Sequence, residues 1–384
     1  MESQSTLIWK IIITISITIA AMSSIIPVDL LSYATNPAYL STLTTTNTSN
    51  PTTISLLAYN PSFPSVIGPN ATARQLYSLD YEAFHEAGVY NHATNKLYVT
   101  SNWAGDINNP INVTVIDLAD NNYSLTSTRY AALAEANGGT SYFPPGTEGN
   151  GSFPSRVLYA DEGDFSSYSS LVSVDPVTNS SERILTSFLG RNFSSLNDVR
   201  QHPGTGDLWF TDADYGYFQH FRPAPSIPKQ VYRFSPRTGE IAVVATDFNQ
   251  PNGLEFSPDL KMLYVSDTGA QGFEQNLTRP ATIYAFDVVN NRNLAGRRTF
   301  AYADNGFPDG VHCDTEGNVW AGCGDGIHVW SAAGTLLGKI WTGVVTNNFA
   351  FLPGKVLVFT NKQLWVVENV RARGREVCRD FGVC

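Results

Sequence analysis

A stretch of about twenty residues recurs along the chain and constrains its fold more than any other feature. Each copy has a polar residue, a short apolar segment, a turn, and a second apolar segment in which Leu or Val precedes Tyr or Trp. Four clear copies begin at Glu86, Asn197, Asn252 and Asp309. A fainter copy begins at Asn347, and a copy starting at Asn137 carries an insertion before "RVLYADEG". Another apolar alternation follows each copy, so one unit holds about four short strands in roughly 40 to 60 residues.

Units of this length and content are typical of propeller blades. We therefore predict an all-β fold, a six-bladed β-propeller with four-stranded antiparallel blades over residues 65–370. A strand within about residues 65–79 is expected to close the ring. This region shows no convincing helical periodicity. Sandwich and barrel folds do not account for repeats in matching register.

The first residue of each clear copy is expected at the mouth of the innermost strand of its blade. Inner strands line the central channel, so these four side chains are expected to converge near its axis. They provide two carboxylates, from Glu86 and Asp309, and two amide oxygens, from Asn197 and Asn252. Oxygen donors of this kind bind hard cations. We expect Ca²⁺, with Mg²⁺ or Zn²⁺ as alternatives. The other interpretation is a wet channel in which these groups bond each other and water.

Three motifs carry a resemblance to a known family: "NDVRQHPGTGDLWFTDADYG", "PNGLEFSPDLKMLYVSD" and "FPDGVHCDTEGNVW". Over about residues 65–370 the chain resembles the gluconolactonase and senescence-marker-protein family of calcium-dependent six-bladed propellers, and most nearly its fungal lactonohydrolase members. The resemblance implies that Glu86, Asn252 and Asp309 bind the metal, and that Asn197 binds metal or contacts substrate. It also implies Asp309 as the general base. Ser195 stands where animal members have an Arg that helps hold a sugar lactone, so their aldonolactone specificity is not expected here.

Other side chains are candidates for the pocket and its support. His85, Trp103 and Tyr215 are candidates to face substrate. His85 is also a second candidate for the general base, although a position in the core or outer wall is the favoured interpretation for it. Asp212 and Asp267 are expected to support the residues that line the pocket or to anchor turns. His312 is expected to support Asp309. Two insertions, residues 137–155 and 216–229, are expected to shape the pocket rim.

The predicted function is that of a lactonase, a carboxylic ester hydrolase. In this scheme the cation polarises the lactone carbonyl while a carboxylate assists the attack of water. Two alternatives stay open: an aryl esterase or phosphotriesterase using the same site, and a non-catalytic binding propeller in which calcium has a structural role. The sequence has no G-x-S-x-G elbow, second zinc-protease His or P-loop. The net charge of −10 argues against a nucleic-acid partner.

The N-terminal sequence indicates export. Residues 1–24 are expected to be a signal peptide, with an uncleaved signal anchor, and hence membrane attachment, as the alternative. Residues 25–64 read as a Thr/Ser/Asn-rich linker. Eight Asn-X-Ser/Thr triplets support a secreted glycoprotein: Asn47, Asn70, Asn112, Asn122, Asn150, Asn179, Asn192 and Asn276.

The four cysteines fit an exported chain without deciding their pairing. Cys378 and Cys384, in the tail formed by residues 371–384, could close a small loop. Cys313 and Cys323 flank a predicted hairpin and could form a second bond. Four unpaired thiols are the alternative.

Overall fold

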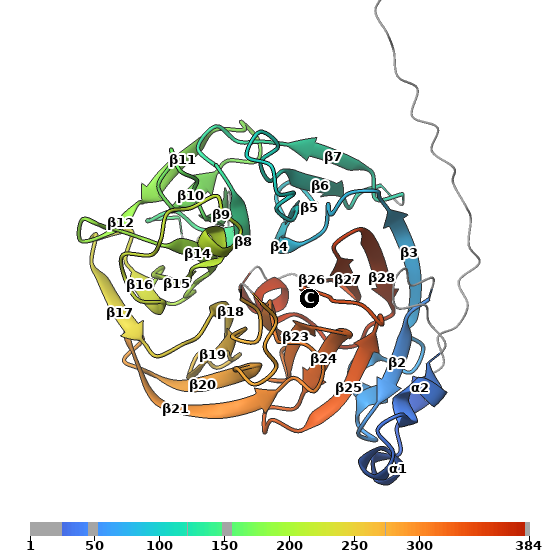
Figure 1. The fold of residues 1–384 in the computed structure, drawn as a ribbon. Helices are drawn as coiled ribbons and strands as arrows, with labels where there is room; N and C mark the ends of the chain where they lie inside the picture. The colour runs from blue at the N-terminus through green and yellow to red at the C-terminus, as the bar shows by residue number, and fades with distance from the viewer. Residues whose placement is uncertain (1–24, 45–52, 121, 148–155, 273, 381–384) are drawn as a thin grey trace, which may run out of the picture.

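The computed structural model shows six four-stranded antiparallel units arranged in a ring (Figure 1), and it describes residues 25–44, 53–120, 122–147, 156–272 and 274–380. The predicted six-bladed β-propeller is therefore confirmed. The first three blades are β4 (Glu86–Asn91), β5 (Lys96–Thr100), β6 (Val113–Asp117) and β7 (Leu125–Thr128); β8 (Ala136–Tyr142), β9 (Arg156–Asp161), β10 (Ser170–Val174) and β11 (Ser181–Leu185); and β14 (Ser195–Gln201), β15 (Leu208–Ala213), β16 (Gln230–Phe234) and β17 (Ile241–Ala245).

The remaining blades follow in the same order around the ring. They are β18 (Pro251–Phe256), β19 (Met262–Asp267), β20 (Thr282–Val289) and β21 (Asn293–Tyr302); β22 (Val311–Cys313), β23 (Val319–Cys323), β24 (Gly326–Trp330) and β25 (Leu336–Trp341); and β26 (Asn348–Leu352), β27 (Lys355–Thr360), β28 (Gln363–Glu368) and β3 (Thr72–Ser78). A short hairpin, β12 (Ser187–Phe188) and β13 (Arg191–Asn192), and a helical turn, α4 (Tyr215–Phe218), lie outside the blades.

Burial falls from the inner to the outer strand of every blade except the fifth, where β2 (Ser55–Ala58) covers β25 and β25 is buried. Every residue of the inner strands β4, β8, β14, β18, β22 and β26 is buried, whereas β7, β11 and β21 are largely exposed. Inner strands contact neighbouring blades on both faces, which explains why even their polar residues are buried.

The ring is closed by a strand from the N-terminal side of the first blade. β3 pairs antiparallel with β28, from Thr72 opposite Glu368 to Ser78 opposite Gln363. The last blade thus takes three strands from one end of the propeller sequence and one from the other. This pairing confirms the predicted closing strand and removes the open edge between the first and last blades.

Part of the segment expected to be a linker instead extends the fifth blade. β2 (Ser55–Ala58) pairs antiparallel with β25, and β1 (Ile25–Pro27) adds parallel to β2. Leu57 and Tyr59 pack with Trp341 in a small apolar cluster, which gives these strands a buried face. Three short helices accompany them: α1 (Leu30–Thr35), α2 (Tyr39–Leu43) and α3 (Phe63–Ile67).

The expected leader, residues 1–24, lies outside the described residues. None of the helices in the part of the chain that the structure describes has the length and apolar character needed to cross a bilayer.

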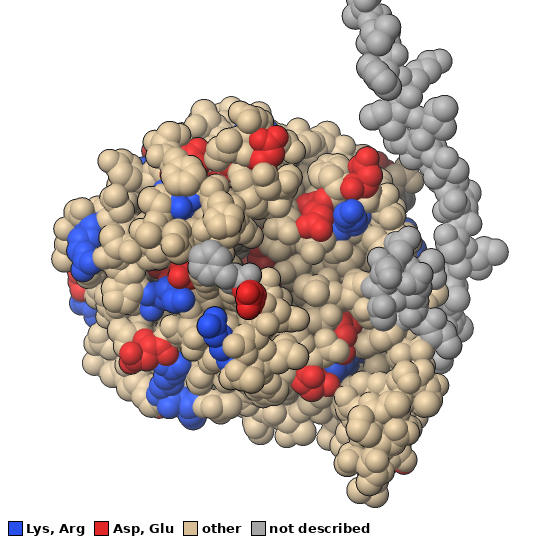
Figure 2. Space-filling model, viewed as in Figure 1, with Lys and Arg blue, Asp and Glu red and all other residues tan. Residues whose placement is uncertain are grey.

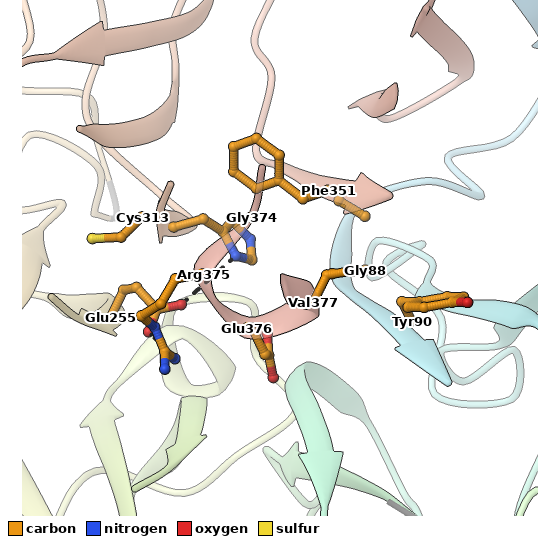
Figure 3. Close-up of a pocket in the computed structure, with 11 residues that line it drawn as sticks. Gly88, Tyr90, Glu255, Cys313, Phe351, Gly374, Arg375, Glu376 and Val377 are labelled. Carbon is orange, nitrogen blue, oxygen red and sulfur yellow. Dashed lines mark hydrogen bonds and ion pairs between the residues drawn. The ribbon is translucent and has the colours of Figure 1, made fainter. Parts of the chain in front are cut away.

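The C-terminal tail turns into the middle of the ring (Figure 1) and ends in the π-helical turn η1 (Glu376–Asp380). Arg375 Nη2 donates to Glu255 Oε1 of β18 at 2.7 Å, and Glu376 Oε1 accepts from Thr140 Oγ1 of β8 at 2.6 Å. Gly374 forms a bridge with Asp314, just after β22. The tail thus ties together the inner strands of three blades at one end of the channel (Figure 3).

The cysteine pairing predicted for the fifth blade is wrong. Cys313 and Cys323 are free, buried thiols. They lie at opposite ends of the β22–β23 hairpin, because the residue opposite Cys313 is Val319. Cys378 is disulfide-bonded, and its expected partner, Cys384, lies outside the described residues.

Candidate active site

The four side chains predicted to converge lie in the wall of one cavity of about 300 Å³. Glu86 is the first residue of β4, Asn197 lies in β14, Asn252 in β18, and Asp309 just before β22. All four are buried. Figure 2 shows the molecule in the view of Figure 1, with charged residues of both signs scattered over the visible face.

Two of these residues, Asn252 and Asp309, are each held by the blade before their own. Thr211 Oγ1, on β15, donates to the main-chain oxygen of Asn252 at 2.8 Å. Ser266 Oγ, on β19, donates in the same way to Asp309 at 2.8 Å. A hydroxyl on the second strand of one blade therefore fixes the backbone of the next blade's cavity residue.

Close approach of neighbouring inner strands explains the glycine that follows two of these residues. A Cβ on Gly253 would lie 2.4 Å from the main-chain oxygen of Asp309, and a Cβ on Gly310 would lie 2.4 Å from the Asn348 side chain. Asn-Gly and Asp-Gly are thus required by contact between blades.

Glu86 and Asp309 form a buried pair of carboxyl groups. Asn348 Nδ2 donates to Glu86 Oε2 at 2.7 Å, and Asn347 Nδ2 donates to Asp309 Oδ2 at 2.8 Å. Burial raises the pKa of Asp309 above its usual range, and burial followed by the charge of Asp309 raises the pKa of Glu86. Two such groups together disfavour the doubly ionised state unless a positive charge lies between them.

Apart from His85, whose charge lowers the pKa of Asp309, the rest of the cavity wall supplies no group that could carry such a charge. Among its lining residues, all within the described part of the chain, there is no Lys or Arg. Asn347 Oδ1 is buried and has no hydrogen-bond donor in the structure. Carboxylates and a free amide oxygen with no Lys or Arg beside them fit a bound Ca²⁺ or similar hard cation.

The residues predicted to face substrate also line this cavity. His85 Nδ1 lies 2.7 Å from Asn361 Oδ1. The Trp103 ring packs 4.6 Å from that of Phe221, and the Tyr215 hydroxyl accepts from Asn252 Nδ2 at 3.3 Å. His85 therefore faces the cavity rather than an outer wall.

His312 supports a different carboxylate from the one expected. Its Nε2 lies 3.0 Å from Asn348 Oδ1, and Asn348 donates to Glu86 rather than Asp309. Burial, then the nearby charge of Arg200, lowers the pKa of His312 to about 3, so the ring is neutral. Because Asn348 Oδ1 is an acceptor, the ring proton belongs on Nε2.

Asp212 and Asp267 anchor backbone rather than reach the cavity. Asp212 accepts from the N–H groups of Ser194 and Ser195, and Asp267 from those of Asn249 and Gln250. Each carboxylate lies near the end of the second strand of its blade and fixes the start of the inner strand beside it.

Comparison with known proteins places this geometry in a family. Residues 90–359 match the sequence model of the SMP-30/Gluconolactonase/LRE-like region. The chain belongs to this family. The lactonohydrolase oryL of Aspergillus oryzae is 30% identical over 331 residues, which cover 79% of this chain and 70% of that protein. The resemblance to fungal lactonohydrolases is confirmed.

Solved structures show that the fold is shared. A gluconolactonase from Xanthomonas campestris superposes with a TM-score of 0.64 at 24% identity, covering 82% of this chain and 94% of that chain. Regucalcin from Agrobacterium tumefaciens, a calcium-binding protein, superposes with a TM-score of 0.57 at 16% identity, covering 78% and 95%.

Sequence reasoning missed two cavity residues of the second blade, Asn137 and Glu162. Asn137 begins the interrupted copy of the repeat, with the same Asn-Gly as the fourth blade, and Thr100 of the first blade donates to its main-chain oxygen at 3.0 Å. That signal could have identified Asn137. Glu162 follows β9 and has no counterpart among the clear copies.

One of the two insertions reaches the cavity rim. Gln219, in the segment 216–229, lines the cavity. The insertion in 137–155 follows Tyr142, at the end of β8 away from Asn137, so its described residues 143–147 lie at the opposite end of the blade. Residues 143–147 therefore do not line the cavity, and residues 148–155 lie outside the described residues, so the expected effect of this insertion on the rim stays a prediction.

A second group of potential metal ligands lies at the tail end of the channel. The ligand atoms of Glu255, His312 and Glu376 all lie within 4.8 Å of one another. Arg375 already pairs with Glu255 at 2.7 Å, and Arg200 Nε lies 3.5 Å from its other oxygen. These guanidinium groups neutralise Glu255 and repel a cation, so the group fits a structural role (Figure 3).

Proposed function

We propose that the protein is a metal-dependent lactonase that opens a small-molecule lactone. The observation that carries the proposal is the buried pair of Glu86 and Asp309 in a cavity without Lys or Arg among its lining residues. Family membership and the lactonohydrolase relative support the reaction class.

Glu86, Asn197, Asn252 and Asp309 would hold the metal, and their oxygen donors favour Ca²⁺. When bound, the cation would polarise the lactone carbonyl and stabilise the oxyanion formed on attack. The calcium-binding regucalcin shares the fold, which supports this choice of ion.

The chain's own side chains have distinct roles in this scheme. Asp309 accepts the proton of the attacking water, and Asn347 fixes the orientation of its carboxyl group. Trp103 and Phe307 provide apolar walls that exclude bulk water, while Tyr215 and His85 offer polar contacts to the substrate.

Hydrolysis of a substrate panel tests the proposal. The purified chain is assayed on aldonolactones, pantoyl lactone, simple alkyl lactones, an aryl ester and a phosphotriester, with added calcium and after chelation. We expect lactone opening that chelation abolishes and calcium restores. Preferential turnover of the aryl ester or phosphotriester would replace the lactonase assignment. Folded, calcium-loaded protein that turns over nothing would indicate a binding propeller.

We also propose that the protein is secreted and N-glycosylated. The apolar leader and the eight sequons support this, and four sequon asparagines lie exposed on the described surface: Asn70, Asn122, Asn179 and Asn192. Asn112 and Asn276 are half-buried, and Asn47 and Asn150 lie outside the described residues.

A further inference from the structure

Glu162 places another carboxyl group in the cavity wall, away from the Glu86–Asp309 pair. It directly follows β9 in the second blade and is 3% exposed. The second and fifth blades lie opposite each other in a ring of six (Figure 1), so Glu162 and Asp309 enter the cavity from opposite sides.

The Glu162 carboxyl is held in a fixed orientation. Asn137 Nδ2 donates to its Oε1 at 3.0 Å, and Ser195 Oγ donates to its Oε2. The N–H of Gly216 donates to Ser195 Oγ at 3.0 Å, which leaves the hydroxyl proton to point at Glu162. Each carboxyl oxygen thus has one donor and keeps capacity for a partner in the cavity.

The charged groups around Glu162 do not pair with it. Asp161 and Glu135 are like charges. Arg222 is the nearby cation, but its guanidinium donates to main-chain oxygens of Phe193, Ser194, Asp164 and Ser167. Burial raises the pKa of Glu162 to about 7. The group therefore carries a proton for much of the time near neutral pH.

We infer that Glu162 is the general acid of the ring-opening step, a role that rests on the proposed lactonase function. Water attacks the carbonyl carbon and gives a proton to Asp309. The bond between that carbon and the ring oxygen then breaks, and the leaving alkoxide takes the proton of Glu162. Glu162 regains a proton from solvent and Asp309 loses one, so the net change is addition of one water.

The leaving group provides the test. An alkyl lactone such as δ-valerolactone expels a strongly basic alkoxide, whereas dihydrocoumarin expels a phenolate that needs little protonation. For Glu162→Gln with calcium at pH 6, we expect kcat/KM to fall by about 10²- to 10⁴-fold on δ-valerolactone. On dihydrocoumarin the loss should stay below about tenfold. Near-equal losses on both lactones, or no loss, would overturn the inference.

Glu135→Gln is the matched control, because Glu135 is a buried neighbour outside the cavity lining that accepts from the N–H of Ile111. It should leave both kcat/KM values within about twofold. Circular dichroism and thermal melting establish that each variant is folded.

A variant that leaves Glu162 in place gives an independent reading. In the wild type, kcat on δ-valerolactone should fall as pH rises through about 7, because the acid loses its proton. The hydrogen bond from Ser195 lowers the pKa of Glu162. Ser195→Ala should therefore move this fall to higher pH, and an unmoved profile in a folded variant would contradict the role.

The same assays distinguish a failure of the proposed lactonase function from a failure of the general-acid role. If the wild type opens neither lactone, the lactonase assignment is wrong and the inference falls with it. If the wild type opens both and Glu162→Gln does so equally well, only the general-acid role is wrong.

Discussion

At the scale of single residues, the central feature is two carboxyl groups buried in a cavity whose lining has no Lys or Arg. Glu86 accepts from Asn348 and Asp309 from Asn347, and amide donors are weaker partners than a full charge. The arrangement costs stability when both groups are ionised and no cation is bound. The two carboxyl groups therefore favour metal binding but lower the stability of the metal-free fold.

Glu86→Gln should separate these two effects. Without metal at pH 8, we expect a higher Tm than that of the wild type, because the substitution removes one of two repelling buried charges. With calcium the order should reverse, because the variant loses a ligand, and lactone hydrolysis should fall below detection. Differential scanning calorimetry with and without calcium measures both.

Glu182→Gln serves as the control, since Glu182 lies exposed on β11 and pairs with Arg156 at the surface. Its Tm should match that of the wild type in both conditions. A Glu86→Gln variant that calcium still stabilises fully, or that stays active, would remove Glu86 from the metal site.

At the scale of elements, the repeat predicted the inner hairpins of the blades. It did not predict the added strand β2 or the contacts that run between blades. The polar residue at each strand mouth followed from matching copies, so Glu86, Asn197, Asn252 and Asp309 could be found without a structure. β2 could not be placed, because nothing in "SLLA" identifies β25 as its partner. The link from His312 to Glu86 also escaped prediction, since it runs through Asn348 on a different blade.

The tail is an element whose contribution is measurable. Arg375→Met removes one of the two guanidinium groups that neutralise the buried carboxylate of Glu255. We expect the free energy of unfolding to fall by about 3 kcal/mol in urea titration. Because this contact lies at the end of the channel away from the candidate active site, kcat/KM should stay within about twofold.

Arg298→Met is the matched control, because its pair with Asp287 is exposed. Its cost should be below about 1 kcal/mol. Equal costs for the two variants would show that the tail contact adds no more than a surface pair.

At the scale of the whole molecule, the way the ring closes affects when the chain can fold during the proposed export. β3 follows the proposed leader and linker along the chain, yet it completes the last blade. The ring therefore closes only when the last strands of the propeller are available. A chain of this topology folds late, so sugar chains would be added before its surface is complete.

Recovery of the chain from the medium of a secreting eukaryotic host tests this path. We expect endoglycosidase treatment to reduce its mass, and Asn→Gln at exposed Asn70, Asn122, Asn179 or Asn192 to remove one glycan each. An unchanged mass, or retention of the chain inside the cell, would contradict the proposal.

The tail that ties β8, β18 and β22 together also affects the route by which substrate enters and product leaves. Because the described tail residues occupy that end of the channel, we expect substrate to enter and product to leave at the end where the cavity lies. The opened hydroxy acid must leave by the route along which the next lactone enters. Product should therefore compete with substrate, and any long substituent on the ring must trail outward toward solvent.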